Sequence, residues 1–135
     1  MLRGTAMDGG GTTPAASDEA VIDLVTLSGI LGETDPAELA QHLDLFFSHF
    51  PSLMDRIDDA IAAKNVMDIA TTAHTAMGAA GMAGAARLRS LLMRIEIAAR
   101  AGDGSVVAAL VPRIRPAYAD IEAFVAEGGL TAGQH

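Results

Sequence analysis

The chain has 135 residues, a formal net charge of −8 and no cysteine, which excludes disulfides, thiol catalysis and cysteine-ligated metals. Half of the residues are hydrophobic but only 4% are aromatic, so the core must consist mainly of aliphatic side chains, which favours packed helices over a β-sandwich. The negative charge opposes phosphate backbones and anionic lipid, and no apolar run approaches the ~20 residues of a membrane span. We expect a cytoplasmic protein that binds neither nucleic acid nor a membrane.

The two ends of the chain differ from its middle in composition. Residues 1–16 are rich in glycine and threonine without any period, so we predict a flexible leader there. Residues 128–135 are predicted to be a flexible tail. Residues 17–127 then form one helical domain, which is large enough to bury a core without a metal.

The first two predicted helices have clear start signals. Ser17 or Asp18 could cap a short helix that ends in the segment 29–32. Asp35 before Pro36 is a typical helix start, and apolar residues at spacings of three and four continue to residue 63. Pro51 lies within this pattern and predicts a kink, because proline has no N–H and crowds the preceding turn.

Three further helices follow with short connections. They are predicted over residues 66–81, with Asn65 as the cap, over 85–101, stopped by Gly102, and over 105–126. Pro112 and Pro116 imply a bend in the last of them. The fold class is therefore all-α, an antiparallel four-helix bundle with an additional short N-terminal helix. The predicted buried stripe of the third helix is Val66, Ile69, Ala73, Ala76 or Met77, and Ala80.

His74 is the most informative residue, because small and apolar residues surround it along the third helix. A glycine inside a helix costs about 1 kcal/mol relative to alanine, so glycines beside a histidine indicate that space is kept clear around the ring. Neutral imidazole is a good nucleophile near neutral pH. The residues three, four and seven positions away share its face, and they are Met67, Ala70, Thr71, Met77, Gly78 and Gly81.

The fourth helix supplies charged groups opposite His74. If it returns antiparallel to the third, its middle lies level with His74, and Glu96 is its only carboxylate. A carboxylate that accepts Nδ1–H fixes the tautomer and leaves Nε2 free to attack. Arg89, Arg94 and Arg100 add positive charge that suits a phosphoryl group.

These residues resemble the motif of the histidine phosphotransfer (HPt) domains of two-component phosphorelays. That motif is approximately Ala-His-x-Leu-Lys-Gly, then Gly-Ala-x-x-Leu, then Leu-Glu, then Arg-x-Gly-Asp. The corresponding residues here are 73–78 (Ala-His-Thr-Ala-Met-Gly), 84–88 (Gly-Ala-Ala-Arg-Leu), 95–96 (Ile-Glu) and 100–103 (Arg-Ala-Gly-Asp). The resemblance extends over residues 21–126, and it departs from the motif where Met77 replaces lysine and Ala76 replaces leucine.

The resemblance implies a phosphocarrier and not an enzyme. His74 would accept a phosphoryl group from an aspartyl-phosphate on a receiver domain and pass it to the receiver of a response regulator. Glu96 would hold the imidazole, and Arg89 or Arg100 would stabilise the phosphoryl group. Catalytic groups and Mg²⁺ would belong to the receiver, so no cofactor is expected on this chain, which we expect to be a monomer. The docking surface would be Ala70, Thr71, Met77, Gly78 and Gly81.

Two other interpretations stay open at this point. The bundle could be an adaptor that docks receivers without transferring phosphate, which the replacement of lysine by Met77 keeps possible. It could also be a helical scaffold unrelated to signalling, in which case the spaced motif residues are a coincidence. His42 and His49 lie seven apart on one helix, but a metal site needs a third converging ligand, so we predict no metal there.

Overall fold

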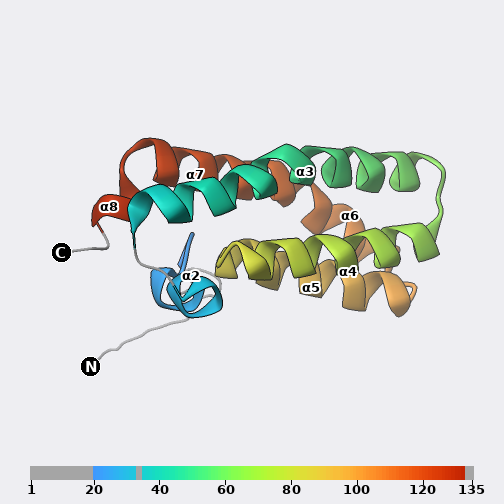
Figure 1. Ribbon diagram of the computed structural model, residues 1–135. Coiled ribbons are helices and arrows are strands. Elements are labelled where there is room, and N and C mark those ends of the chain that lie inside the picture. Colours follow the sequence, from blue (N-terminus) through green and yellow to red (C-terminus); the bar gives the residue numbers. More distant parts are fainter. Residues whose placement is uncertain (1–19, 33–34, 133–135) are drawn as a thin grey trace, which may run out of the picture.

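The computed structural model describes residues 20–32 and 35–132, and all regular elements in these ranges are helical (Figure 1). They are α2 (Leu24–Leu31), α3 (Pro36–Ala62), α4 (Val66–Met82), α5 (Ala86–Arg100), α6 (Gly104–Leu110), the 3₁₀ helix η2 (Val111–Arg113), α7 (Ile114–Ala126) and α8 (Gly129–Ala132). The predicted all-α class is confirmed. Within these residues, no helix combines the length and the apolar character that crossing a membrane requires. The predicted leader, residues 1–16, lies outside the described residues.

The long helices lie side by side in two layers. Figure 1 shows α3 and α7 above α4 and α5, with α2 beneath one end and α6 at the other. Direct packing joins α4 to α5, α3 to α4, α3 to α7 and α5 to α7. The pair α4–α5 forms one face of the molecule, and this is the face that carries His74.

The starts of α3 and α4 agree with the capping residues predicted from the sequence. The side chain of Asp35 accepts a hydrogen bond from the N–H of Ala37 at 3.1 Å, with Pro36 in the first turn. The side chain of Asn65 accepts one from the N–H of Asp68 at 3.0 Å. Both caps satisfy helix N–H groups that otherwise have no partner inside the helix.

Pro51 lies inside α3, and the helix continues through it. Proline cannot donate the hydrogen bond that would normally end on the carbonyl four residues earlier, which is that of Phe47. The hydroxyl of Tyr118 on α7 donates to this carbonyl at 3.4 Å. A partner from another helix therefore replaces the missing bond and links α3 to α7 at this point.

The predicted caps Ser17 and Asp18 lie outside the described residues, and α2, the first helix within the described part, begins later than a cap at either residue predicts. It starts at Leu24, and the side chain of Asp23 accepts from the N–H of Thr26 at 3.1 Å, which lowers the pKa of Asp23. The segment before it is attached to the turn between α4 and α5, where the N–H of Asp23 donates to the carbonyl of Gly84. Gly84 has φ +69°, and a Cβ there would lie 3.0 Å from Leu27 Cβ. This turn therefore requires glycine.

The last predicted helix is in fact several elements. Residues 105–126 were expected to form one bent helix, but Pro112 lies in the 3₁₀ turn η2 between α6 and α7. Pro116 is tolerated because it lies in the first turn of α7, where an N–H is not needed. The predicted flexible tail also begins too early, because residues 129–132 form α8 and Leu130 is buried.

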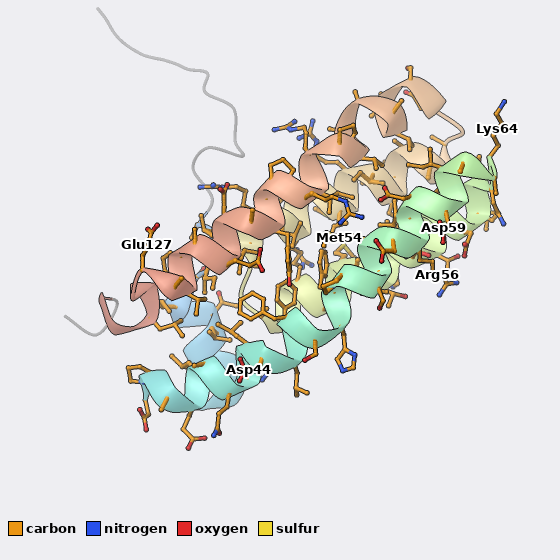
Figure 2. The ribbon with its side chains drawn as sticks, turned by 90° about the horizontal axis from the view of Figure 1, so that it is seen from above. Asp44, Met54, Arg56, Asp59, Lys64 and Glu127 are labelled. Atoms are coloured by element: carbon orange, nitrogen blue, oxygen red, sulfur yellow. The ribbon has the colours of Figure 1, made fainter. Side chains whose placement is uncertain are left out.

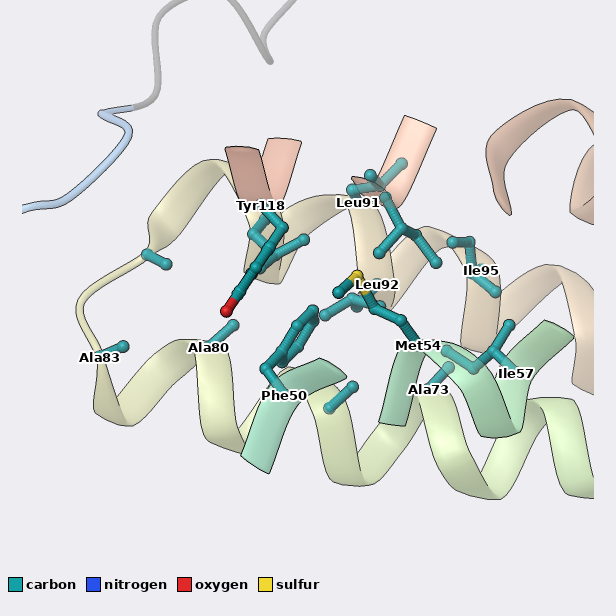
Figure 3. Close-up of a cluster of buried hydrophobic side chains, with 14 of the residues drawn as sticks. Phe50, Met54, Ile57, Ala73, Ala80, Ala83, Leu91, Leu92, Ile95 and Tyr118 are labelled. Carbon is teal, nitrogen blue, oxygen red and sulfur yellow. The ribbon is translucent and has the colours of Figure 1, made fainter. Parts of the chain in front are cut away.

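The core contains large side chains on one side and small ones on the other. Figure 3 shows Ala73 and Ala80 of α4 beneath larger residues from α3, α5 and α7, among them Phe50 and Leu92. Met54 points between α3 and α7 in Figure 2. The aromatic rings of α3 pack on Tyr118, and its ring is stacked on that of Phe50 at a centroid distance of 5.3 Å. Small side chains on α4 let α5 approach closely.

Candidate functional site

His74 lies on the outer face of α4 with its side chain 63% exposed. Its neighbour Ala73 is completely buried, as are Ala76 and Ala80 on the same inner face. This pattern confirms most of the predicted buried stripe, but Val66 is 44% exposed and does not belong to it. The helix therefore fixes its backbone through alanines on the inside and presents the imidazole to solvent.

The imidazole of His74 is hydrogen-bonded to Glu96 on α5. Nδ1 lies 3.0 Å from Oε1 and 3.1 Å from Oε2 of the carboxylate. An ionised carboxylate can only accept, so the proton of the neutral ring is on Nδ1. Nε2 then carries the free lone pair, which is the arrangement that a nucleophilic histidine needs.

Glu96 has a second partner on its own helix. Nε of Arg100 donates to Oε2 at 2.8 Å, across one turn of α5. Burial opposes ionisation of Glu96, but the hydrogen bonds from Arg100 and His74 outweigh it and lower the pKa of the carboxyl below its usual value. The side chain of Glu96 is 14% exposed, so this carboxylate is sheltered as well as ionised.

Two contacts define how α4 and α5 face each other. His74 meets Glu96, and Arg89 lies over Gly81, where an added Cβ would be 3.4 Å from Cδ and Nε of the arginine. Arg89 lies seven residues before Glu96, so the two contacts have the same spacing along both helices. Gly81 is seven residues after His74, which places Arg89 about 10 Å further along the helix axis. Arg87, in contrast, faces α7, where it lies 3.7 Å from Asp120.

The predicted docking residues do not all reach the surface. Thr71 and Gly78 are exposed, and Met77 and Gly81 are partly buried. Ala70 is completely buried and cannot contact a partner, so its assignment to the docking surface was wrong. The reason is that α4 packs against both α3 and α5, which makes its inner face wider than a single stripe.

Exposed apolar side chains on α4 and α5 extend beyond the predicted docking residues. Met67 on α4 is 62% exposed, and Met82 beyond Gly81 is 53% exposed. On α5, Met93 and Ile97 are also exposed and lie within one turn of Glu96. Sequence reasoning missed Met82, Met93 and Ile97. The spacing of Met93 three residues before Glu96 was the available signal, because such residues share a helix face.

His42 and His49 do not belong to this site. Nε2 of His42 donates to the carbonyl of Met82 at 2.8 Å, so this side chain of α3 satisfies the C-terminal end of α4. His49 is exposed on α3. Among residues 20–32 and 35–132, no group of three or more histidine, cysteine, aspartate or glutamate side chains could hold a metal.

A comparison with protein families matches residues 41–124 to the Hpt domain. The chain belongs to the Hpt domain family. No curated protein and no solved structure matches it significantly. The family match covers α4 and α5 completely, together with most of α3 and α7. Membership implies a role related to phosphotransfer in two-component signalling, in which Hpt domains act as carriers that interact with receiver domains.

The structure explains why two segments of the Hpt-like motif contain glycine in this chain. Gly84 lies in the left-handed region at the turn before α5. Gly102, with φ +74°, ends α5, and the side chain of Asp103 then accepts from the N–H of Val106 at the start of α6. These residues set the ends of α5 and thereby hold Glu96 opposite His74.

Proposed function

We propose that His74 is the phosphoacceptor of a phosphorelay carrier that takes the group from the aspartyl-phosphate of one receiver domain and gives it to another. The observation that supports this most strongly is the exposed imidazole with Nδ1 on Glu96, within a chain of the Hpt family. The protein would be a carrier and not an enzyme, because the receiver would provide Mg²⁺ and the groups that activate the transfer.

The chemistry that this arrangement supports is a simple exchange of bonds at phosphorus. Nε2 of His74 attacks the phosphorus, the N–P bond forms, and the O–P bond to the receiver aspartate breaks with its electron pair going to the carboxylate. The ring gains positive charge as this occurs and keeps the proton on Nδ1. Glu96 accepts that proton's hydrogen bond and stabilises the charge, as carboxylates do beside catalytic imidazoles.

The docking surface that we propose consists of Thr71, Met77, Gly78 and Gly81. Gly78 has open space where a Cβ would be, so the partner's backbone could approach His74 closely on this side. Exposed methionines extend the surface on both sides, and flexible thioethers adapt well to an apolar partner.

Of Arg89 and Arg100, the two arginines expected to stabilise the phosphoryl group, we propose that Arg89 supplies the positive charge. Met77 supplies none, although the related motif has lysine at this position. Arg89 has its side chain directed across Gly81 on the face that carries His74, whereas Arg100 is hydrogen-bonded to Glu96. The adaptor function, docking without transfer, remains the competing proposal because of Met77.

We further propose that α3, α4, α5 and α7 form the antiparallel four-helix bundle expected from the sequence, with α2 as the additional helix. The direct packing between α4 and α5, α3 and α4, α3 and α7, and α5 and α7 supports it. As a separate proposal, the carrier would act in the cytoplasm on the receivers of hybrid kinases and response regulators.

The test of the function is labelling by a receiver domain that carries a radioactive aspartyl-phosphate. The native protein should acquire an acid-labile, base-stable label, and His74→Gln should acquire none while keeping its helical circular dichroism. His49→Gln is the matched control, because His49 is also exposed but lies on α3. Undiminished labelling of His74→Gln would contradict the assignment, and receiver binding without any labelling would select the adaptor.

A further inference from the structure

Arg100 makes its hydrogen bond to the carboxylate that holds His74. Its Nε contacts Oε2 of Glu96, and both oxygens of Glu96 lie within 3.1 Å of Nδ1 of His74. Three side chains therefore form one chain of hydrogen bonds from α5 to α4. This chain ends on Nδ1 of His74, which is not the attacking nitrogen.

The imidazole needs such support because packing does not fix it. Its side chain is 63% exposed, and in the described part of the chain its hydrogen bonds are both to Glu96. An exposed ring with one partner can rotate, and its proton can move to Nε2, where it blocks the lone pair. The orientation of His74 thus depends on how firmly Glu96 is held.

Glu96 is itself a flexible side chain with three rotatable bonds. Arg100 restrains it, because an arginine Nε–H points in a fixed direction from a planar group. The spacing of four residues with glutamate first is also the favourable order for such a pair on a helix. With Oε2 anchored in this way, the carboxylate keeps both oxygens on the imidazole.

From this geometry we infer that Arg100 is a positioning residue that acts through Glu96 to keep His74 in the tautomer with a free Nε2. The inference deepens and rests on the proposed phosphoacceptor function. In this role Arg100 does not contact the phosphoryl group. Glu96 lies between the guanidinium and the imidazole, and the phosphoryl group would be attached to the nitrogen on the other side of the ring.

Arg94 offers a matched control on the same helix. It carries the same charge and is exposed, but it lies two residues before Glu96, so it points to a different side of α5. Arg94→Gln and Arg100→Gln therefore remove the same charge, and only the second removes a partner of Glu96. Both arginines are exposed, so neither substitution leaves a buried group without a partner.

The first measurement is the nitrogen NMR spectrum of His74 in the unphosphorylated, ¹⁵N-labelled protein above the pH at which the ring titrates. We expect the proton on Nδ1 in the native protein and in Arg94→Gln. In Arg100→Gln a substantial fraction should carry it on Nε2. An unchanged tautomer in Arg100→Gln would overturn the inference. Because no phosphate is involved, this result is independent of whether the protein accepts a phosphoryl group.

The second measurement is a double-mutant cycle on the rate of transfer from a phosphorylated receiver. We expect Arg100→Gln to slow transfer about tenfold in the native background, but less than about twofold when Glu96→Ala is already present. A tenfold loss in both backgrounds would show that Arg100 acts directly on the phosphoryl group and would contradict the inference. A correct tautomer without any transfer would instead contradict the proposed function alone.

Discussion

The α4–α5 face and the α3–α7 face both pair arginine with carboxylates, but in opposite proportions. On α3 and α7, one cation, Arg115, contacts two carboxylates, Asp55 at 3.0 Å and Asp58 at 2.7 Å, and all three side chains are more than half exposed. On α4 and α5, one sheltered carboxylate, Glu96, contacts Arg100 and His74. Burial of the carboxylate and the identity of the third group, His74 here and Asp58 there, therefore decide what such an arginine–carboxylate pair does.

The packing beneath the two faces also differs in the size of the side chains. Large aromatic rings fill the space between α3 and α7, where Phe50 is stacked on Tyr118. Burial and the nearby charge of Glu122 raise the pKa of the Tyr118 hydroxyl, which therefore stays protonated and donates to α3. Alanines line the inner side of α4. We expect substitutions in the buried aromatic packing between α3 and α7 to have the largest effect on stability, and substitutions near His74 on the α4–α5 face to change transfer.

The largest effect on stability is expected from Phe50→Ala. Phe50 is completely buried, and removing its ring should lower the free energy of unfolding by about 3–5 kcal/mol. Urea denaturation followed by circular dichroism measures this value. In the fraction that remains folded, the tautomer of His74 should be unchanged. A loss below about 1 kcal/mol would contradict the importance of this aromatic packing.

Gly78→Ala on the α4–α5 face is expected to raise stability and to slow transfer. A Cβ at this position meets open space, so alanine should stabilise the helix by about 0.5–1 kcal/mol. The methyl group would nevertheless stand between His74 and an approaching receiver, so transfer should slow several-fold. Thermal unfolding and the transfer rate measure the two effects separately.

Gly104→Ala is the control for this change. Gly104 also has open space around its Cβ position, but it lies on α6, away from His74. It should leave the transfer rate unchanged. If Gly78→Ala transferred as fast as Gly104→Ala, the proposed docking surface would be wrong at this position.

The smallest effect is expected from Arg115→Gln. Its ion pairs with Asp55 and Asp58 are exposed, and such pairs contribute about 0–1 kcal/mol. The unfolding free energy should therefore change by no more than about 1 kcal/mol, and the tautomer of His74 not at all. A change in that tautomer would show that the two faces are coupled and would contradict their independence.

Much of the fold could be predicted from local sequence signals. Asp35 with Pro36, Asn65, and Gly102 mark helix ends through hydrogen bonds or backbone conformations that depend on residues close in sequence. The ends that were wrong depend on tertiary contacts. Leu130 is buried within a segment rich in glycine, and α2 begins only after a segment that is attached to the turn at Gly84.

The site was predictable to a similar extent. His74 and Glu96 could be placed opposite each other by counting back along two helices, and their hydrogen bond agrees with that count. Ala70 was misplaced because helix spacing alone does not show how many neighbours a helix has. The hydrogen bond from Arg100 to Glu96 was not predicted, although a spacing of four residues on one helix is a signal for such a pair.

The most direct test of the proposed function is to determine which nitrogen of His74 carries the phosphoryl group after transfer from a receiver. Phosphorus–nitrogen couplings in the NMR spectrum of ¹⁵N-labelled protein identify the atom. We expect phosphorylation at Nε2, with the proton retained on Nδ1 beside Glu96. Phosphorylation at Nδ1, or on any residue other than His74, would contradict it.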